Sequence, residues 1–167
     1  MAGLSGSGKS TTAQQLVARS HAIRLRSDAI RKHLAGVSLH EKGGDEIYTA
    51  DMTDQTYSRL IELGVQLAER GELIILDAKF DRQAKRKESL EAAQAANIDL
   101  TFLHCTAPAE VLKARVENRS GDIADATAAI LAGQSMEPFK EGDPVVVIDT
   151  TQEADVIQPL LETVFAR

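Results

Sequence analysis

Residues 3–10, close to the start of the chain, restrict the possible folds more than any other segment. They read Gly-Leu-Ser-Gly-Ser-Gly-Lys-Ser and match the spacing Gly-x-x-x-x-Gly-Lys-Ser/Thr in full. Glycine allows backbone angles at which successive N–H groups point into one anion-binding nest, and a helix that begins at Lys9 adds its positive end. The segment therefore predicts a loop around the phosphates of a nucleotide, between a strand and a helix of an α/β sheet.

The side chains of this phosphate loop have predicted tasks. Lys9 reaches the β- and γ-phosphates, and Ser10 holds Mg²⁺. A glycine-rich turn that matches by chance is the alternative, but Gly6 and the helical stretch after Lys9 weigh against it. The predicted nucleotide-binding residues are Gly3, Leu4, Ser5, Gly6, Ser7, Gly8, Lys9, Ser10 and Thr11.

The rest of the chain alternates short apolar runs with helical stretches. The runs 23–26, 73–76, 100–105 and 145–148 lack polar alternation, so we expect parallel strands that are buried on both faces. The expected helices cover residues 9–20, 28–34, 51–70, 81–96, 108–118, 122–132 and 153–166. This order predicts one domain over residues 1–167, with a doubly wound parallel sheet flanked by helices.

The start of the chain departs from this pattern. Only Met1 and Ala2 precede Gly3, which is too few residues for the central strand that normally leads into such a loop. We therefore expect the first strand to be missing from the chain, which leaves room for a further domain upstream. The polar, glycine-containing segments 36–50 and 119–124 are expected to form mobile covers.

Asp28 and Arg31 follow the 23–26 run, at the kind of strand-to-helix junction where the ligand crevice of an α/β sheet opens. A carboxylate there can take the proton of a substrate hydroxyl as that hydroxyl attacks the γ-phosphate. Arg31 shares a helix face with Asp28 and can orient the acceptor. The residues alone leave a second interpretation equally open, in which Asp28 only caps the helix and pairs with Arg31.

Asp77 follows the 73–76 run directly. A carboxylate at the end of a buried strand can bind Mg²⁺ directly or through water, and the alternative is an aspartate that caps the next turn. Arg82 and Lys85 come next along the chain. They either line the acceptor pocket or are solvated helix residues, and the solvated interpretation is slightly favoured.

Charge and composition exclude several classes of function. The net charge of -6 argues against a protein that grips a nucleic-acid backbone, which needs clustered lysine and arginine. Cys105 is the single cysteine, so no internal disulfide can form, which suits the cytoplasm. No apolar run approaches the ~20 residues of a membrane span. The histidines show no metal-ligand spacing, and the Asn-Lys-x-Asp segment of guanine-specific GTPases does not occur.

Several of these segments together resemble a known group. The phosphate loop, the Ser-Asp-Ala-Ile-Arg segment, the Leu-Ile-Ile-Leu-Asp-Ala run and the helix with Arg115 and Arg119 are similar to P-loop kinases known as predicted kinases or AAA-family ATP-binding proteins. The likeness spans nearly the whole chain. It is strongest to the ATP-binding domain fused behind aminoglycoside-phosphotransferase-like domains, and it implies the P-loop NTPase fold.

The resemblance also implies roles for individual residues. In polynucleotide kinase and zeta toxin, which belong to the wider group, an Asp-x-x-Arg element supplies the catalytic aspartate; Asp28 and Arg31 match it. Similar kinases close a lid, about residues 115–135 here, whose arginines reach the phosphates. Arg115 and Arg119 match those arginines, and the alternative is an exposed helix with Glu117 as ion partner.

Three functions follow from the sequence. The leading one is a phosphotransferase that moves the γ-phosphate of ATP, with Mg²⁺, to a hydroxyl of a small molecule. A polynucleotide 5′-hydroxyl kinase and a non-catalytic ATP-binding regulatory module of a larger protein are the alternatives. The predicted catalytic residues are Lys9, Asp28, Arg115 and Arg119, the substrate residues are Asp28, Arg31 and Arg82, and the metal ligands are Ser10 and Asp77.

Overall fold

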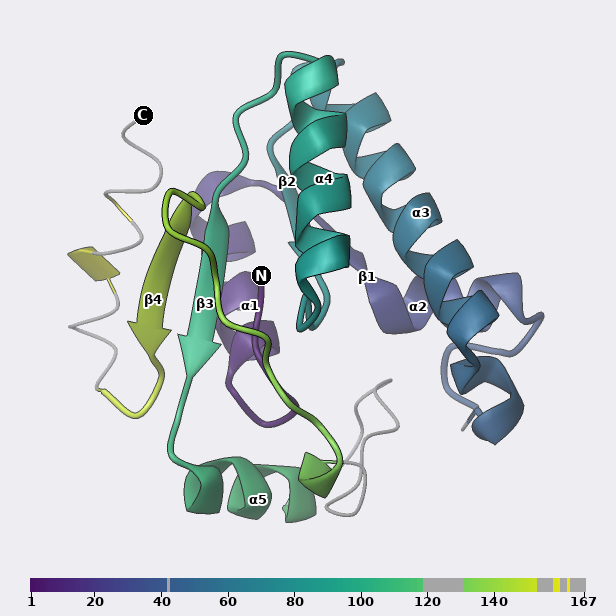
Figure 1. The fold of residues 1–167 in the computed structure, drawn as a ribbon, viewed down its shortest axis with the longest axis vertical. Helices are drawn as coiled ribbons and strands as arrows, with labels where there is room; N and C mark the ends of the chain where they lie inside the picture. Colours follow the sequence, from purple (N-terminus) through teal and green to yellow (C-terminus); the bar gives the residue numbers. More distant parts are fainter. Residues whose placement is uncertain (42, 119–130, 153–157, 160–161, 163–167) are drawn as a thin grey trace.

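Strands and helices alternate along the chain as the apolar pattern predicts. The computed structural model describes residues 1–41, 43–118, 131–152, 158–159 and 162 (Figure 1). The strands are β1 (Ile23–Arg26), β2 (Ile74–Asp77), β3 (Phe102–Thr106) and β4 (Val145–Asp149). The helices are α1 (Lys9–Ser20), α2 (Ser27–Leu34), α3 (Ala50–Ala68), α4 (Gln83–Ala95) and α5 (Ala109–Glu117), with a short 3₁₀ helix η1 (Asp45–Tyr48).

Two parallel strand pairs meet around the start of the chain. β1 pairs with β2, and β3 pairs with β4. The N–H of Ala2 donates to the Leu103 carbonyl at 2.8 Å, and its carbonyl accepts from the Cys105 N–H at 2.9 Å. The amino group of Met1 donates to the Leu76 carbonyl at 2.7 Å. Met1 and Ala2 thus lie between β2 and β3, at the place where a central strand leading into the phosphate loop is expected.

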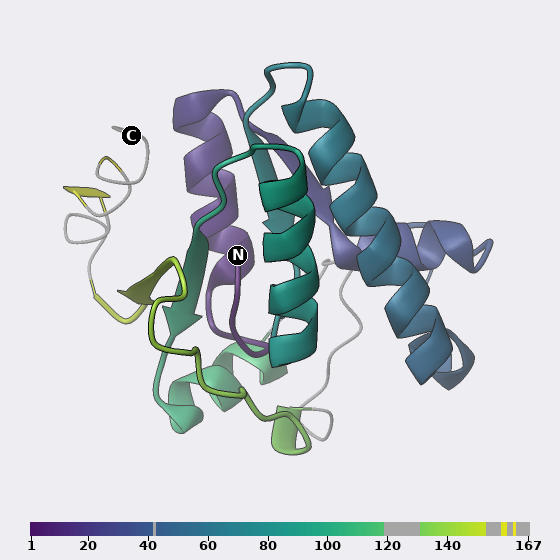
Figure 2. The ribbon, with the colours of Figure 1, turned by 45° about the horizontal axis from the view of Figure 1, so that its top comes forward.

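Helices cover both faces of this sheet. α1 packs on one face, where Leu16 lies in a core cluster with Leu103 and Ile148. α3 and α4 lie side by side on the opposite face, over a cluster that includes Tyr57 and Phe102 (Figure 2). Because successive residues of a strand face opposite sides, Phe102 and Leu103 serve different layers. The layered α/β fold with parallel strands is therefore confirmed, and no described helix is long and apolar enough to cross a membrane.

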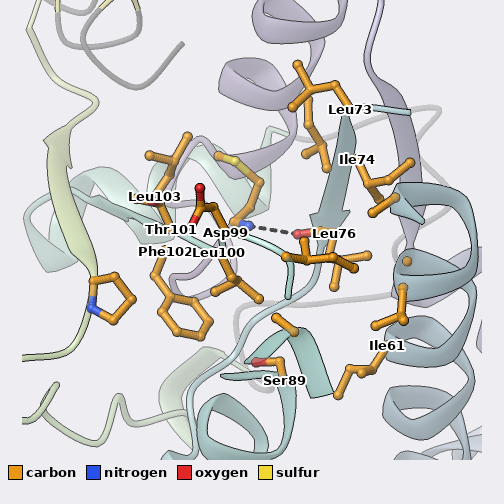
Figure 3. Close-up of a pocket in the computed structure, with 18 of the residues that line it drawn as sticks. Ile61, Leu73, Ile74, Leu76, Ser89, Asp99, Leu100, Thr101, Phe102 and Leu103 are labelled. Carbon is orange, nitrogen blue, oxygen red and sulfur yellow. Dashed lines mark hydrogen bonds between the residues drawn. The ribbon is translucent and has the colours of Figure 1, made fainter. Parts of the chain in front are cut away.

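A cavity of about 500 Å³ opens between the two strand pairs (Figure 3). Residues 73–76 line it on the β2 side, and residues 98–103 line it on the β3 side. Leu16 of α1 and Ile61 of α3 close it from the two helical layers. The cavity is mainly apolar and adjoins Met1, because Met1 and Ala2 fill only the carboxyl end of the space between β2 and β3.

Strand ladders run further than predicted at their carboxyl ends. Asp77 is part of β2 because it stands opposite Arg26 of β1, and Asp149 is part of β4 because it stands opposite Thr106 of β3. The predicted starts at residues 73 and 100 are too early. The predicted helices over residues 122–132 and 153–166 lie mostly outside the described residues.

The beginnings of two helices correct the predictions. The interpretation of Asp28 as a cap is wrong, because α2 begins at Ser27 and its N-cap residue is Arg26. Asp28 lies in the first turn, where a negative charge favours the helix dipole. α3 begins at Ala50, since the Thr49 hydroxyl caps it by accepting from a backbone N–H of the first turn at 3.2 Å.

Two buried cations of α2 hold the segment 36–50. Arg31, 7% exposed, donates to the Ile47 carbonyl at 2.9 Å and to the Thr53 hydroxyl at 3.2 Å. Lys32 is 2% exposed and donates to the Glu41 carbonyl at 2.8 Å. The predicted cover is therefore tied to the helix that carries Asp28.

A third buried cation fixes the return of the chain toward β4. Arg86 of α4 is 1% exposed and donates to the carbonyls of Phe80, Glu137 and Pro138 at 2.8, 2.9 and 2.8 Å. Its guanidinium also lies over the Phe139 ring at 4.2 Å. One side chain thus satisfies carbonyls from two distant segments of the chain.

We expect Arg86→Met to lower the free energy of unfolding by about 3–5 kcal/mol, because it leaves buried carbonyls without donors. Urea unfolding followed by circular dichroism measures this change. Lys87→Met is the matched control on the same helix; the Lys87 side chain is 69% exposed, and its loss should change stability by less than about 0.5 kcal/mol. Equal effects of the two substitutions on the free energy of unfolding would contradict the structural role of Arg86.

Candidate functional site

The carboxyl ends of the strands bring the predicted site residues to one edge of the sheet. The phosphate loop leaves the sheet at Gly3, whose N–H donates to the Lys79 carbonyl just after β2 at 2.9 Å. β1 ends beside β2, with Arg26 opposite Asp77. Asp28 follows two residues later, in the first turn of α2. This is the edge at which parallel α/β sheets bind ligands.

The loop backbone depends on glycine at its crowded points. Gly6 has φ 79°. A Cβ added there would lie 2.5 Å from the Leu112 carbonyl oxygen of α5. Gly8 has φ 84° and precedes α1 as its N-cap residue. The Lys9 ammonium donates to the Leu4 carbonyl at 2.8 Å, so it lies across the loop. Gly6 and Gly8 thus take left-handed backbone angles, and the Lys9 ammonium lies over the start of the loop.

The predicted metal ligands lie side by side. The Ser10 hydroxyl donates to Oδ2 of Asp77 at 3.3 Å, and the Asp77 side chain is only 5% exposed. Hydroxyl and carboxylate oxygens are the hard donors that Mg²⁺ prefers, so these residues fit the predicted magnesium site. Within the described parts of the chain, no group of three or more histidine, cysteine, aspartate or glutamate residues forms an all-protein metal cluster.

Arg24 of β1 is a member of the site that the sequence did not predict. Its Nε donates to Oδ2 of Asp77 at 3.0 Å, and its terminal NH2 group donates to the same oxygen. The Arg24 side chain is 17% exposed. A cation held by Ser10 and Asp77 would therefore share the carboxylate with the Arg24 guanidinium.

Asp28 is half-buried and shares the electrostatic environment of the loop. Burial raises the pKa of its carboxyl group above the usual 3.8. The positive charge of Arg26 opposes this rise, the Asp77 carboxylate adds to it, and Arg31 and Lys9 lower the pKa again. A carboxyl group with a raised pKa, close to the phosphate loop, is suited to accept a proton.

Arg115 of α5 and Thr150, the residue after β4, form a clamp that supports the phosphate loop. The Arg115 guanidinium donates to the hydroxyl and the carbonyl of Thr150, both at 2.8 Å, and to the Gly6 carbonyl at 3.4 Å. The Thr150 hydroxyl lies 2.9 Å from the Ser7 carbonyl. A Cβ on Gly8 would come within 3.0 Å of the Thr150 side chain. The clamp therefore fixes the middle of the loop to the end of β4.

The segment after the undescribed residues 119–130 also touches the loop. The Gln134 carboxamide accepts from the Ser5 N–H at 3.0 Å and donates to the Ser5 hydroxyl at 3.1 Å. Three residues on, Glu137 accepts from the Gln83 N–H at 2.6 Å and pairs with Arg82 at 3.2 Å. This segment thus connects the loop to the start of α4.

The remaining predicted residues lie at different places. Arg31 is turned toward η1 and α3, and Arg82 is largely exposed beside Glu137. The interpretation of Lys85 as solvated is wrong, because its side chain is 17% exposed and pairs with Asp54 and Glu88. Glu117 pairs with Lys113. Arg119 lies outside the described residues, and Thr11 is exposed on the first turn of α1.

Comparisons with known proteins agree with this architecture. The family model described as AAA domain matches residues 1–138. A sugar kinase from a Janibacter species superposes with a TM-score of 0.72 at 24% identity, over 96% of this chain and 89% of that chain. The APS kinase CysC of Mycobacterium tuberculosis, in complex with AMPPNP and APS, superposes with a TM-score of 0.74 at 20% identity, over 99% and 95%. No curated protein sequence matches the chain.

A more distant protein shares the same fold. Kti12 of Chaetomium thermophilum, in complex with ADP-AlF3, superposes with a TM-score of 0.72 at 17% identity, over 99% of this chain and 95% of that chain. At such identities the likeness establishes the architecture, and the chemistry has to be argued from the residues of this chain.

The clamp predicts a difference between neighbouring threonines. Thr150→Val removes the hydroxyl between Arg115 and the Ser7 carbonyl, so we expect Mg-ATP affinity to fall about tenfold, or ~1.4 kcal/mol. Thr151→Val is the control, because the exposed Thr151 hydroxyl bonds to Asp149 and to no residue of the loop in the part of the chain that the structure describes. Isothermal titration calorimetry measures both. Wild-type affinity in Thr150→Val would show that the loop holds its form without the clamp.

Proposed function

Since this chain belongs to the AAA domain family, we propose that it is a phosphotransferase that moves the γ-phosphate of ATP to a hydroxyl group of a small molecule. The observation that carries the proposal is the meeting of Ser10 with Asp77 across 67 residues of sequence. This contact brings the phosphate loop to the end of β2, beside the first turn of the helix that carries Asp28. Nucleotide, metal and base residues then share one site.

The loop binds the nucleotide through its backbone and Lys9. N–H groups at the amino end of α1 and the lysine ammonium supply positive charge for the β- and γ-phosphates. The Lys9 ammonium lies at the Leu4 carbonyl, at the start of the loop, so it can move from a carbonyl to a phosphate oxygen without a change in the backbone. The clamp of Arg115 and Thr150 keeps the loop in this form.

Ser10 and Asp77 would hold Mg²⁺. The ion would supply positive charge for the phosphate oxygens of the nucleotide. Asp77 stays oriented by Arg24, which donates to its Oδ2 atom. Arg24 thereby places a fixed positive charge beside the two residues that would hold the ion.

Asp28 acts as the general base. Its carboxylate accepts the proton of the acceptor hydroxyl as the hydroxyl oxygen forms a bond to the γ-phosphorus and the bond to the β-phosphate oxygen breaks. The raised pKa supports this role, because a base with a higher proton affinity takes the proton more readily. Arg31 has a positioning role. It donates to the Ile47 carbonyl of η1 and so fixes α2, the helix that carries the base.

A small-molecule acceptor fits this chain better than a polynucleotide. The net charge of -6 disfavours binding to the phosphate backbone of a nucleic acid, and several arginines near the site already have partners within the protein. Arg24 binds Asp77, Arg31 binds a carbonyl, and Arg82 binds Glu137.

Arg119 is the remaining predicted lid arginine, and we propose that it closes over the phosphates while Arg115 supports the loop.

A panel of sugars, sugar acids, nucleosides, aminoglycosides and a 5′-hydroxyl oligonucleotide, each with Mg-ATP, tests the function. We expect acceptor-dependent ADP formation with one small molecule, and a fall in kcat of about 10²–10⁴ in Asp28→Asn with Mg-ATP affinity unchanged. Asp51→Asn, at an exposed position in the first turn of α3, is the control. ATP binding without turnover on any acceptor would favour the regulatory module, and labelling of the oligonucleotide would favour the polynucleotide kinase.

The pH dependence tests the base separately. Because Asp28 works only when deprotonated and its pKa is raised by burial, kcat/KM for the acceptor should fall as the pH drops through a value above 3.8. Stopped-time assays between pH 4 and 8 are expected to show this acid limb in wild type and in Asp51→Asn, with circular dichroism to confirm folding. If the residual kcat/KM of Asp28→Asn falls over the same acidic pH range, a group other than Asp28 is responsible for the fall.

A further inference from the structure

The register of β1 and β2 places Arg24 and Asp77 on the same face of the sheet. Arg24 stands opposite Ile75, and Asp77 follows Ile75 by two residues, so the three side chains share that face. Ile75 belongs to the core cluster that also contains Leu16 of α1, the helix that carries Ser10. Arg24 therefore reaches Asp77 from a diagonal position in the ladder, on the face that α1 covers.

One carboxylate oxygen of Asp77, Oδ2, accepts from both Ser10 and Arg24. The Ser10 hydroxyl lies at 3.3 Å and the Arg24 Nε at 3.0 Å, and the terminal NH2 group of Arg24 donates to the same atom. The side chains of Asp77 and Arg24 are 5% and 17% exposed, so solvent screens the pair weakly. The guanidinium therefore offsets the charge of the carboxylate on which the proposed metal site depends.

This arrangement is unfavourable for a divalent cation that arrives without a nucleotide. Ser10 and Asp77 offer one hydroxyl and one carboxylate, and no cluster of three or more acidic, histidine or cysteine residues occurs among the residues that the structure describes. The Arg24 guanidinium repels an ion that shares its carboxylate, and charges interact more strongly in a buried site than in water. A nucleotide changes the balance, because its phosphates bring negative charge and oxygen ligands for the ion.

We propose that Arg24 makes the metal site selective for a metal–nucleotide complex over a free divalent cation. The inference rests on the proposed function, because it takes Ser10 and Asp77 as the metal ligands. Arg24 orients the Asp77 carboxylate before the nucleotide binds, and its charge opposes the ion unless phosphate charge arrives with it. Arg24 acts through Asp77 and is therefore a positioning residue, one that determines which form of the metal the site accepts.

Mn²⁺ binding to the full chain tests the proposal without any turnover. Electron paramagnetic resonance gives the Kd of free Mn²⁺, and titration calorimetry gives the Kd of Mn-ATP. Arg24→Gln should bind free Mn²⁺ about tenfold more tightly than wild type, and the ratio of the two Kd values should fall by about the same factor. Arg59→Gln removes the same charge from an exposed position, where Arg59 is 44% exposed and pairs with Glu62, and it should behave like wild type.

Two further measurements separate this role from a merely structural one. Arg24→Gln leaves the buried Asp77 carboxylate without its cation, which can impair folding, so thermal unfolding of wild type provides a readout without any substitution. Mg²⁺ alone should leave the wild-type Tm unchanged, whereas Mg-ATP at about 100-fold its Kd should raise it by about 5–10 °C. In Arg24→Ala, millimolar guanidinium chloride should weaken the binding of free Mn²⁺ again, and the same concentration of sodium chloride should weaken it less.

The outcomes that overturn the inference differ from those that overturn the proposed function. Equal affinity of wild type and Arg24→Gln for free Mn²⁺, with Mn-ATP binding retained in both, would remove the selective role of Arg24 and leave the metal site intact. A rise of the wild-type Tm with Mg²⁺ alone would also contradict the inference, because the site would then accept a free ion. If wild type bound neither free Mn²⁺ nor Mn-ATP, the proposed metal site and the phosphotransfer would fail together.

Discussion

The hydrogen bonds of Met1 and Ala2 fix the point at which the phosphate loop leaves the sheet. Ala2 bonds to β3 and Met1 bonds to β2, so the chain enters the phosphate loop at the carboxyl edge of the sheet. From that position Ser10 reaches Asp77 at 3.3 Å. Without this placement the loop would still have its local form, but its serine and the strand-end carboxylate would lie on separate units of the fold.

The two carboxylates of the site differ in burial and in their partners. Asp77 is buried and paired with Arg24, whereas Asp28 is half-buried in the first turn of α2. The same sheet edge thus holds Asp77, which is suited to bind a metal, and Asp28, which is suited to accept a proton. Their different surroundings distinguish the two roles. Burial raises the pKa of Asp28, and the neighbouring cations limit that rise.

Local chemistry explains what the sequence could predict. The glycine spacing of the loop fixes its backbone, and unalternating apolar runs identify the buried strands, so fold and nucleotide residues follow from short segments. Contacts between distant segments explain the rest. Arg24 meets Asp77 across 53 residues of sequence, and Gln134 meets Ser5 across 129, and neither contact leaves a local signature. The signal for Arg24 was the arginine itself, because a guanidinium in a half-buried strand needs hydrogen-bond acceptors, and the Asp77 carboxylate of the neighbouring strand supplies one.

The support of the loop by Thr150 has a consequence for biosynthesis. The Thr150 hydroxyl and the Ser7 carbonyl are 143 residues apart in sequence, near opposite ends of the chain. During translation, the complete glycine-rich loop therefore leaves the ribosome long before β4 is synthesised. Contacts between such distant residues form late, because the intervening chain must first be ordered. The phosphate loop therefore gains the support of Thr150 only after β4 has been synthesised.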